Sequence, residues 1–367
     1  MRMSRRALAA ASALILAGGG AAIAATVASA SQGSACNNAA AGHTYRHGWV
    51  PTVHCAGPGL STYGFDLQYQ GGIDGIGVTT GAPKVYLVFW GSQWGTSGVN
   101  SNGDRTFSND PMSAAPYLQE FFKGVGTPGD GWSAVATQYC QGVRVGSATC
   151  PATNNQHVGY AWGGALAGVW EDNSASEPAV ATAHQIGQEA IRAAAHFGNT
   201  TPAANRNVQY DIVSSTGLSP DGFLDSGFCA WHDWNGDSTL DGGGAVFSPY
   251  GDIAFTNMPY VTDVGQSCGQ NFVNSGDAGA LDGWSIVNGH EFMETITDQN
   301  PTGGWFNNTT QLENGDICAW IPPGTPGGSF DLSDGTGTYA VQTTWADDAH
   351  VFAASGCEGN HPVVRNP

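Results

Sequence analysis

The sequence predicts one compact domain of the α/β or α+β class, held by disulfide bonds and containing long loops. Short runs of β-branched and aromatic residues alternate with segments in which apolar residues have helical spacing, and this predicts the mixed class. Composition is a third indication, because 54 of the 367 residues are glycine and only 11% are charged. Such a composition favours turns and short strands. No internal repeat divides the chain, so we expect a single domain over residues 66–367.

The first 30 residues have the pattern of a signal peptide. Arginines at positions 2, 5 and 6 precede a long apolar run that ends in Ala28-Ser29-Ala30. This pattern is typical of a cleaved secretory signal, with a membrane anchor as the alternative. We therefore expect a secreted, extracellular protein without a membrane span after cleavage. Residues 31–65 are interpreted as an N-terminal arm or pro-region.

Four segments predict the first strands and helices. Residues 83–95 read as a buried strand that glycine ends, and residues 207–216 as a second strand with alternating apolar side chains. Residues 110–126 and 129–140 have the apolar spacing of short helices. Together with the helix described next, these segments give the order strand, three helices, strand.

The strongest helical pattern covers residues 174–199. Ser176 is the predicted N-cap, Pro178 lies in the first turn, and Gly198 ends the helix. This helix lies between the two predicted strands in the sequence.

Eight cysteines follow the predicted cleavage site. An even number in an exported protein indicates disulfide bonds, and the absence of a C-x-x-C pair argues against a thiolate metal site. On the order of 100 pairings are possible, so spacing does not fix the connectivity. The simplest pairing joins sequence neighbours: Cys36–Cys55, Cys140–Cys150, Cys229–Cys268 and Cys318–Cys357.

The chain is strongly acidic. Its formal net charge is −19, and loss of the three signal-peptide arginines makes it −22. A surface of this charge repels nucleic acid and anionic lipid, so neither is an expected partner. The oligomeric state stays open.

Residues 287–298, VNGHEFMETITD, predict a helix with a metal-binding pattern. His290 and Glu294 are four residues apart and share a helix face, with Glu291 beside them. In the zinc-protease pattern H-E-x-x-H the outer residues bind zinc and the inner glutamate is the general base. A second glutamate keeps this chemistry, although its charge loosens selectivity toward Mn²⁺ or Ca²⁺. The alternative is a helix with a solvated polar face.

A third metal ligand is predicted at Glu313, which follows Glu294 after eighteen intervening residues. Three of the eight glutamates of the chain fall between positions 291 and 313, which favours a shared site. Asp298, one turn further along the helix, could orient a ligand or bind the metal. Asp316 is the reserve ligand.

The segment 228–244, FCAWHDWNGDSTLDGGG, is a second polar cluster. His232 could be a metal ligand or a catalytic hydrogen-bond donor, although such a histidine is more often simply packed. Acidic and amide residues alternate after it as in the first half of an EF-hand loop, but glycine at the sixth position and glutamate at the twelfth are missing. Calcium binding there is a weak hypothesis, and its ligands would be Asp233, Asn235, Asp237 and Asp241.

Residues 265–269, GQSCG, match the nucleophile-elbow pattern G-x-S-x-G. A true elbow needs a strand before it and a helix after it, and the flanking sequences predict neither. Ser267 is therefore a weaker candidate than the metal site.

Three motifs in order resemble the secreted EXORDIUM-like, phosphate-induced proteins of plants and their bacterial relatives. They are YQGGIDGIGVTTGAPKVYLVFWGSQW, YDIVSSTGLSPDGFLDSGFCAWHDW and DGWSIVNGHEFMETITDQNPTGGWF, within residues 67–320. The resemblance implies a secreted protein, with plant members similar to cell-wall growth and carbon-status proteins. Those members generally lack the His-Glu pair, so this chain resembles a bacterial branch with a peptidase-type site. The spacing of Glu294 and Glu313 resembles that of the gluzincin metalloproteases.

These patterns favour a secreted metal-dependent hydrolase, most simply a zinc endopeptidase acting on extracellular peptides or proteins. His290, Glu294 and Glu313 would hold zinc, and Glu291 would be the base. The rival hypothesis is a non-catalytic extracellular binding or wall-associated protein, with calcium as its metal if it has one. A serine hydrolase that uses Ser267 is the third.

Overall fold

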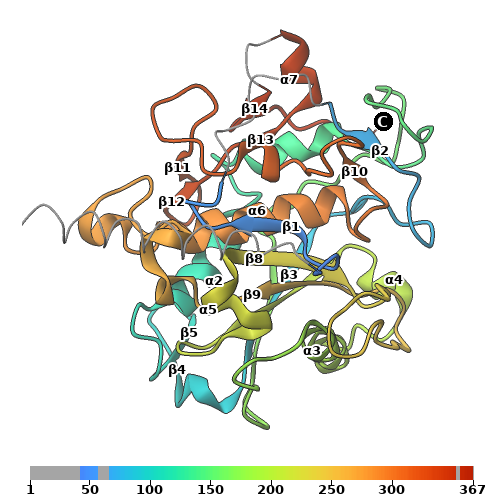
Figure 1. Ribbon diagram of the computed structural model, residues 1–367. Coiled ribbons are helices and arrows are strands. Elements are labelled where there is room, and N and C mark those ends of the chain that lie inside the picture. Colours follow the sequence, from blue (N-terminus) through green and yellow to red (C-terminus); the bar gives the residue numbers. More distant parts are fainter. Residues whose placement is uncertain (1–41, 57–65, 353–355, 367) are drawn as a thin grey trace, which may run out of the picture.

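A six-stranded sheet lies at the centre of the computed structural model, which describes residues 42–56, 66–352 and 356–366 (Figure 1). The strand order is β1-β8-β9-β7-β3-β6. β6, β3, β7 and β9 pair in parallel, whereas β8 runs antiparallel to β9 and β1 antiparallel to β8. The strands are β1 (His47–Pro51), β8 (Phe228–Trp234), β9 (Ala254–Met258), β7 (Val208–Ser214), β3 (Lys84–Trp90) and β6 (Leu166–Asp172). The mixed α/β class expected from the sequence is confirmed.

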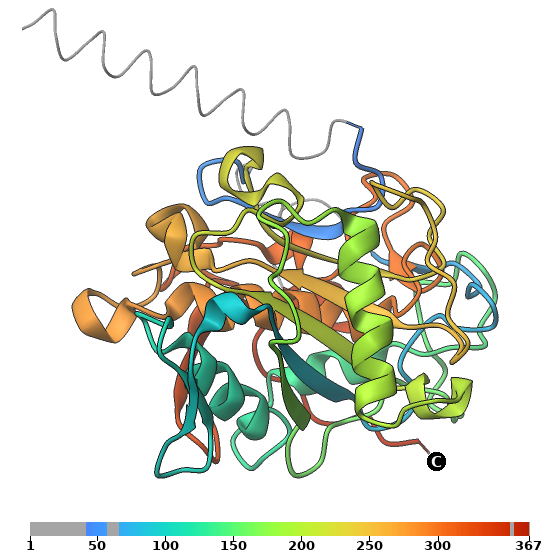
Figure 2. The same cartoon turned by 90° about the horizontal axis from the view of Figure 1, so that it is seen from below.

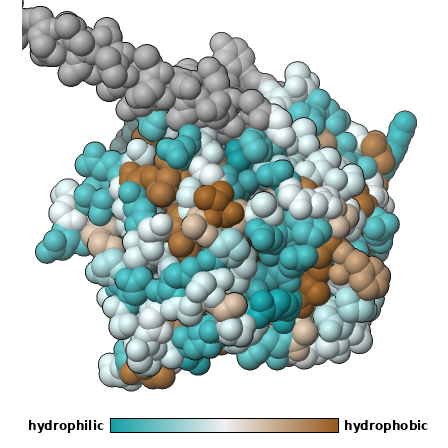
Figure 3. Space-filling model, turned by 60° about the horizontal axis from the view of Figure 1, so that its bottom comes forward, coloured by the Kyte–Doolittle hydropathy of each residue, from teal (hydrophilic) through white to brown (hydrophobic). Residues whose placement is uncertain are grey.

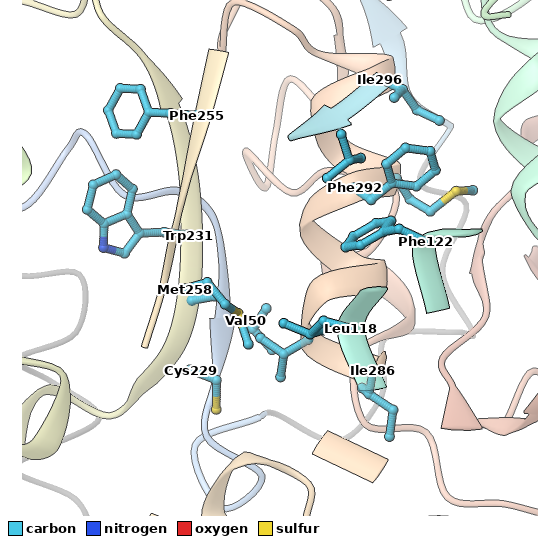
Figure 4. Close-up of a cluster of buried hydrophobic side chains, with 14 of the residues drawn as sticks. Val50, Leu118, Phe122, Cys229, Trp231, Phe255, Met258, Ile286, Phe292 and Ile296 are labelled. Atoms are coloured by element: carbon cyan, nitrogen blue, oxygen red, sulfur yellow. The ribbon is translucent and has the colours of Figure 1, made fainter. Parts of the chain in front are cut away.

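Two long helices cover opposite faces of this sheet, α6 (Asp282–Thr297) on one and α3 (Ala183–His196) on the other (Figures 1 and 2). All seven residues of β7 are buried, as expected for a strand covered on both faces, although Gln209, Asp211 and Ser214 are polar. α2 (Ala114–Gly124) packs beside α6, with the Phe122 and Phe292 ring centroids 5.9 Å apart. Figure 4 shows Ile286 and Ile296 of α6 in the cluster of buried hydrophobic side chains that also contains Phe122 of α2.

The start of α3 differs from the prediction. Thr182, and not Ser176, is the N-cap: its hydroxyl accepts from the Gln185 N–H, and the Gln185 side chain accepts from the Thr182 N–H. This reciprocal capping box satisfies two backbone donors, whereas Ser176 contacts only the Ser92 hydroxyl. The predicted end is confirmed, because Gly198 follows with a left-handed φ of 74°.

Short strands, single turns and loops make up the rest of the described chain. The segment 129–140 contains a 3-10 helix, Ser133–Gln138, in place of the predicted helix. The smaller elements are β2 (Gln68–Tyr69), β4 (Ser97–Val99), β5 (Arg105–Phe107), α4 (Pro202–Asn205), α5 (Phe223–Ser226), β10 (Trp305–Phe306), β11 (Phe330–Ser333), β12 (Thr338–Val341), β13 (Thr344–Trp345), α7 (Asp347–Phe352) and β14 (Cys357–Glu358).

Three disulfide bonds join sequence neighbours as predicted: Cys140–Cys150, Cys229–Cys268 and Cys318–Cys357. Cys36 of the fourth predicted pair lies outside the described residues. Cys55, its predicted partner, is disulfide-bonded.

The face of the molecule in Figure 3 is largely polar, with separate hydrophobic patches. Over residues 42–56, 66–352 and 356–366, no helix combines the length and apolarity needed to cross a membrane. The signal peptide expected at residues 1–30 lies outside these ranges.

Candidate metal centre

Helix α6 carries the H-E-x-x-E residues into the interior of the protein. All sixteen of its residues are buried, and His290, Glu291 and Glu294 have no exposed surface. The alternative of a solvated polar helix face is therefore wrong. Burying ionisable side chains costs free energy unless partners compensate, so the partners of these three decide what the site is.

Strand β8 adds His232 to this site. Successive strand residues point to opposite faces. Trp231 packs edge-on against Phe255, away from α6 (Figure 4), so His232 points toward α6. His232 has no exposed surface, and neither ring nitrogen has a hydrogen-bond partner.

The loop after α6 supplies Glu313 and Asp316. Asn314 fixes this loop on the helix by donating to the Met293 carbonyl at 3.2 Å and to the Thr297 hydroxyl at 3.0 Å. The Asp316 N–H donates to Glu294 Oε1 at 2.9 Å. The Cys318–Cys357 disulfide follows directly and ties the loop to β14.

The converging side chains form two groups that share Glu294. In the first, His232 Nε2 lies 3.8 Å from Glu294 Oε2 and 3.4 Å from Glu313 Oε1. In the second, His290 Nε2 lies 3.0 Å from Glu294 Oε1 and 3.7 Å from Asp316 Oδ1. The predicted trio of His290, Glu294 and Glu313 is thus divided between two groups. His232 and Asp316 complete them.

The orientation of His290 points the lone pair of one ring nitrogen at a carboxylate oxygen. Its Nδ1 lies 3.1 Å from Gln342 Oε1, while the Gln342 amide nitrogen donates to the Gly315 carbonyl at 2.8 Å. Nδ1 therefore carries the proton, and the Nε2 lone pair faces Glu294 Oε1. Two lone pairs at 3.0 Å repel each other unless a positive charge lies between them.

Burial sets the protonation preferences of the site. It lowers the pKa of His232 to about 3 and the pKa of His290 to about 4, so both imidazoles are neutral, as metal binding requires. Burial, followed by repulsion from neighbouring carboxylates, raises the pKa of Glu294 well above its usual range. Burial raises the pKa of Asp316 to about 7, against the opposing effect of the hydrogen bond from the Glu313 N–H. A bound cation would reverse the preference of the carboxyl groups.

Strand β1 covers the site. Gly48 has a φ of 48°, and a Cβ atom at this position would overlap the Glu294 carboxylate and lie 2.7 Å from His232 Nε2. Only glycine allows the backbone this close. A cavity of about 440 Å³ adjoins the strand, lined by Gly48, Trp49, Glu313 and Asp316 among others.

Other predicted site residues serve different purposes. Asp298 is buried at the end of α6, where its carboxylate accepts from the N–H groups of Thr302 and Gly303 at 2.9 and 3.1 Å, so it shapes the exit turn. Ser267 lies in a 3-10 turn, Gly265–Cys268, with no strand directly before it, so GQSCG is not a nucleophile elbow.

The predicted calcium loop is not arranged as an EF-hand. Asp233 and Asp237 converge with His47. The Asn235 side chain instead accepts from the Ile253 N–H and donates to a backbone carbonyl, and Asp241 is exposed. Calcium needs six to eight oxygen ligands, and this group offers two carboxylates and an imidazole.

Sequence reasoning missed Gly48 and Gln342, which orient and cover the site. The glycine preceding Trp49 and the glutamine in the C-terminal part have no local pattern that indicates these contacts. Comparisons of the chain with protein-family models, curated proteins and solved structures found no match.

Proposed function

We propose that the protein is a metal-dependent hydrolase, most simply a zinc endopeptidase. One observation carries the proposal: His232, Glu294 and Glu313 converge from β8, α6 and the following loop, fully or almost fully buried. Tetrahedral zinc with bonds of 2.0–2.2 Å separates neighbouring ligand atoms by about 3.3–3.5 Å. The distances of 3.4 and 3.8 Å to His232 Nε2 are close to this spacing.

Glu291 is the general base in this proposal. It is fully buried, and both of its carboxylate oxygens lack a hydrogen-bond partner. Burial, with smaller contributions from Asp316 and Glu313, raises its pKa well above the usual range, and shifted pKa values of this kind are common among residues that transfer protons. A zinc ion would polarise a substrate carbonyl and a water molecule. Glu291 would accept the proton that the water loses and deliver it to the leaving amine.

The proposal also gives the N-terminal arm a role. β1 pairs with β8 antiparallel and lies over Glu294 at Gly48. An extended peptide substrate would bind to the same strand edge, because strand addition satisfies its backbone hydrogen bonds. We therefore interpret the segment 42–56 as part of a pro-region that must move away before a peptide enters. Three disulfides suit the oxidising compartment of an exported enzyme.

A second candidate is a non-catalytic extracellular protein in which the metal only supports the fold. The position of β1 over Glu294 favours it. If β1 stays in place, an extended peptide cannot pair with β8 beside the site. The resemblance to EXORDIUM-like proteins suits this candidate equally well.

Glu291→Gln distinguishes the candidates. We measure casein hydrolysis and bound zinc in the parent, in Glu291→Gln and in the control Glu120→Gln, which alters a partly exposed glutamate on α2. Glu291→Gln should keep zinc and lose at least a roughly hundredfold factor in hydrolysis. The control should match the parent. Full turnover by Glu291→Gln would exclude the mechanism, and a zinc-loaded parent that never hydrolyses casein would favour the second candidate.

A further inference from the structure

The carboxylate of Glu294 divides its two oxygens between two different ligand groups. Oε1 lies 3.0 Å from His290 Nε2, and Oε2 lies 3.8 Å from His232 Nε2. Each group has one histidine and one further carboxylate, from Asp316 and Glu313 respectively. A single ion bound to one group would leave the other histidine facing the carboxylate without a cation.

The charge of the fully ionised cluster favours more than one divalent ion. Glu291, Glu294, Glu313 and Asp316 are four carboxyl groups with little or no exposed surface. In the part of the chain that the structure describes, no lysine or arginine forms an ion pair with any of them. When all four carboxyl groups are ionised, their total charge is −4. One divalent ion reduces this charge to −2, and two divalent ions neutralise it. Uncompensated buried charge is strongly unfavourable.

Unpartnered atoms point independently to a ligand on both sides. Glu294 Oε2, Glu313 Oε2 and both ring nitrogens of His232 lack hydrogen-bond partners, although all three residues are at most 4% exposed. On the other side, Gln342 turns the lone pair of His290 Nε2 toward Glu294. Buried polar groups in native proteins are almost always satisfied, so these atoms point to a ligand at this position, and an ion suits the ring nitrogens and carboxylates together.

We propose that Glu294 bridges two divalent metal ions, one held by His232 and Glu313 and the other by His290 and Asp316. Mixed imidazole and carboxylate ligands suit zinc or manganese. Two-metal sites hold their ions about 3.5–4 Å apart, a separation that one bridging carboxylate spans. The inference rests on the metal centre of the proposed function but not on its catalysis.

Metal stoichiometry tests the pair. The full-length exported protein is equilibrated with zinc, freed of unbound ions by gel filtration and analysed for zinc per chain. We expect two ions in the parent, one in Asp316→Asn and one in His232→Ala. His361→Ala and Asp237→Asn are matched controls, because Asp348, Glu358 and His361, and likewise His47, Asp233 and Asp237, are the other groups that could hold an ion. Both controls should retain two.

Electron paramagnetic resonance of the manganese-loaded parent gives a second measurement that needs no variant. Two ions that share a carboxylate should give an exchange-coupled spectrum, whereas isolated Mn²⁺ gives six separate lines. Any of three results would overturn the two-metal proposal and leave a single-metal hydrolase possible. They are one zinc per chain in the parent, an uncoupled manganese spectrum, and loss of the second ion in a control variant but not in Asp316→Asn. No bound metal would overturn the proposed function as well. Two coupled ions without hydrolysis would sustain the pair and exclude only the catalysis.

Discussion

Glu177 is a buried glutamate outside the metal centre that makes stability depend on pH. Its Oε1 accepts from the Ser214 hydroxyl at 2.6 Å, and its Oε2 has no hydrogen-bond partner. Burial raises the pKa of Glu177 to about 8, against the opposing effect of the Ser214 hydrogen bond. The folded state therefore keeps a proton that the unfolded chain releases above about pH 4.5. This contribution to stability is lost as the pH rises through about 8.

We expect Glu177→Gln to reduce the loss of unfolding free energy between about pH 7 and pH 8 by about 1 kcal/mol. The measurement is urea unfolding at several pH values. Ser214→Ala is the matched control, because it removes the hydroxyl partner but keeps the carboxyl group, and it should retain the slope of the parent. If the Glu177→Gln slope equals that of the parent, the carboxyl group is already ionised at pH 7.

At the residue scale, the sequence predicted the members of the candidate metal centre better than their grouping. Helical spacing put His290 and Glu294 on one face, because that relation is local. Spacing alone could not show that Glu313 lies beside His232, since that contact depends on how β8 packs on α6. The glycine that covers the site was even harder to predict from the sequence. Gly48 contacts Glu294 across 246 residues, and no local rule relates the two.

Helix α3 shows at the element scale how a cap is chosen. Ser176 and Thr182 are both good capping residues, and the sequence favoured the first because Pro178 follows it. Only Thr182 has a glutamine three residues later, at Gln185, whose side chain returns the hydrogen bond. The reciprocal pair outweighs the proline preference, so the helix begins at Ala183.

Alanine substitutions at Thr182 and Ser176 should differ in their effect on the free energy of unfolding. Thr182→Ala should lower the unfolding free energy by about 1 kcal/mol, because the Gln185 N–H loses its acceptor. Ser176→Ala, the matched control, should change it by less than about 0.5 kcal/mol, since its hydroxyl contacts only that of Ser92. Thermal or urea unfolding of the two variants measures both. Equal effects would mean that the capping box does not set the start of α3.

The sequence predicted two strands of the central sheet and the helices α2, α3 and α6, but neither the other strands nor the strand order. β3 is an apolar run and β7 alternates apolar with polar residues, so the sequence indicates both directly. Their position as neighbours, with β9 next to β7 and β1 at the edge beyond β8, depends on pairings between distant segments. The short elements β10 to β14 contain two to four residues each, too few for any periodicity.

For the whole molecule, the question is how a closed site could be reached. The three described disulfides join neighbouring cysteines within the body of the domain. Noncovalent contacts hold β1 on the sheet, beginning with its pairing to β8. Arg46 adds a buried ion pair. Its Nε lies 2.6 Å from Asp221 Oδ2, and both side chains are buried. Tyr45 and Trp231 also donate to this carboxylate.

Arg46→Met should therefore loosen β1 while leaving the metal ligands intact. Methionine retains the apolar stem, but Asp221 loses its cation, and breaking a buried pair costs about 3–5 kcal/mol. This cost falls on the docking of the arm, because Arg46 and Tyr45 both belong to the arm, whereas Trp231 of β8 still donates to Asp221 when the arm moves. We expect bound zinc to be lost to a chelator faster than in the parent, with an increase in casein hydrolysis if the site is catalytic.

Arg105→Met is the control for this experiment. Arg105 pairs with Glu171 at 3.4 Å, has a side chain that is 37% exposed and lies on β5, outside the metal centre. The same substitution there should leave chelation and hydrolysis unchanged. Hydrogen exchange at β1 checks that Arg46→Met loosens the strand. If exchange accelerates while zinc loss does not, β1 does not control access to the metal, and the cavity beside Glu313 and Asp316 is the alternative route.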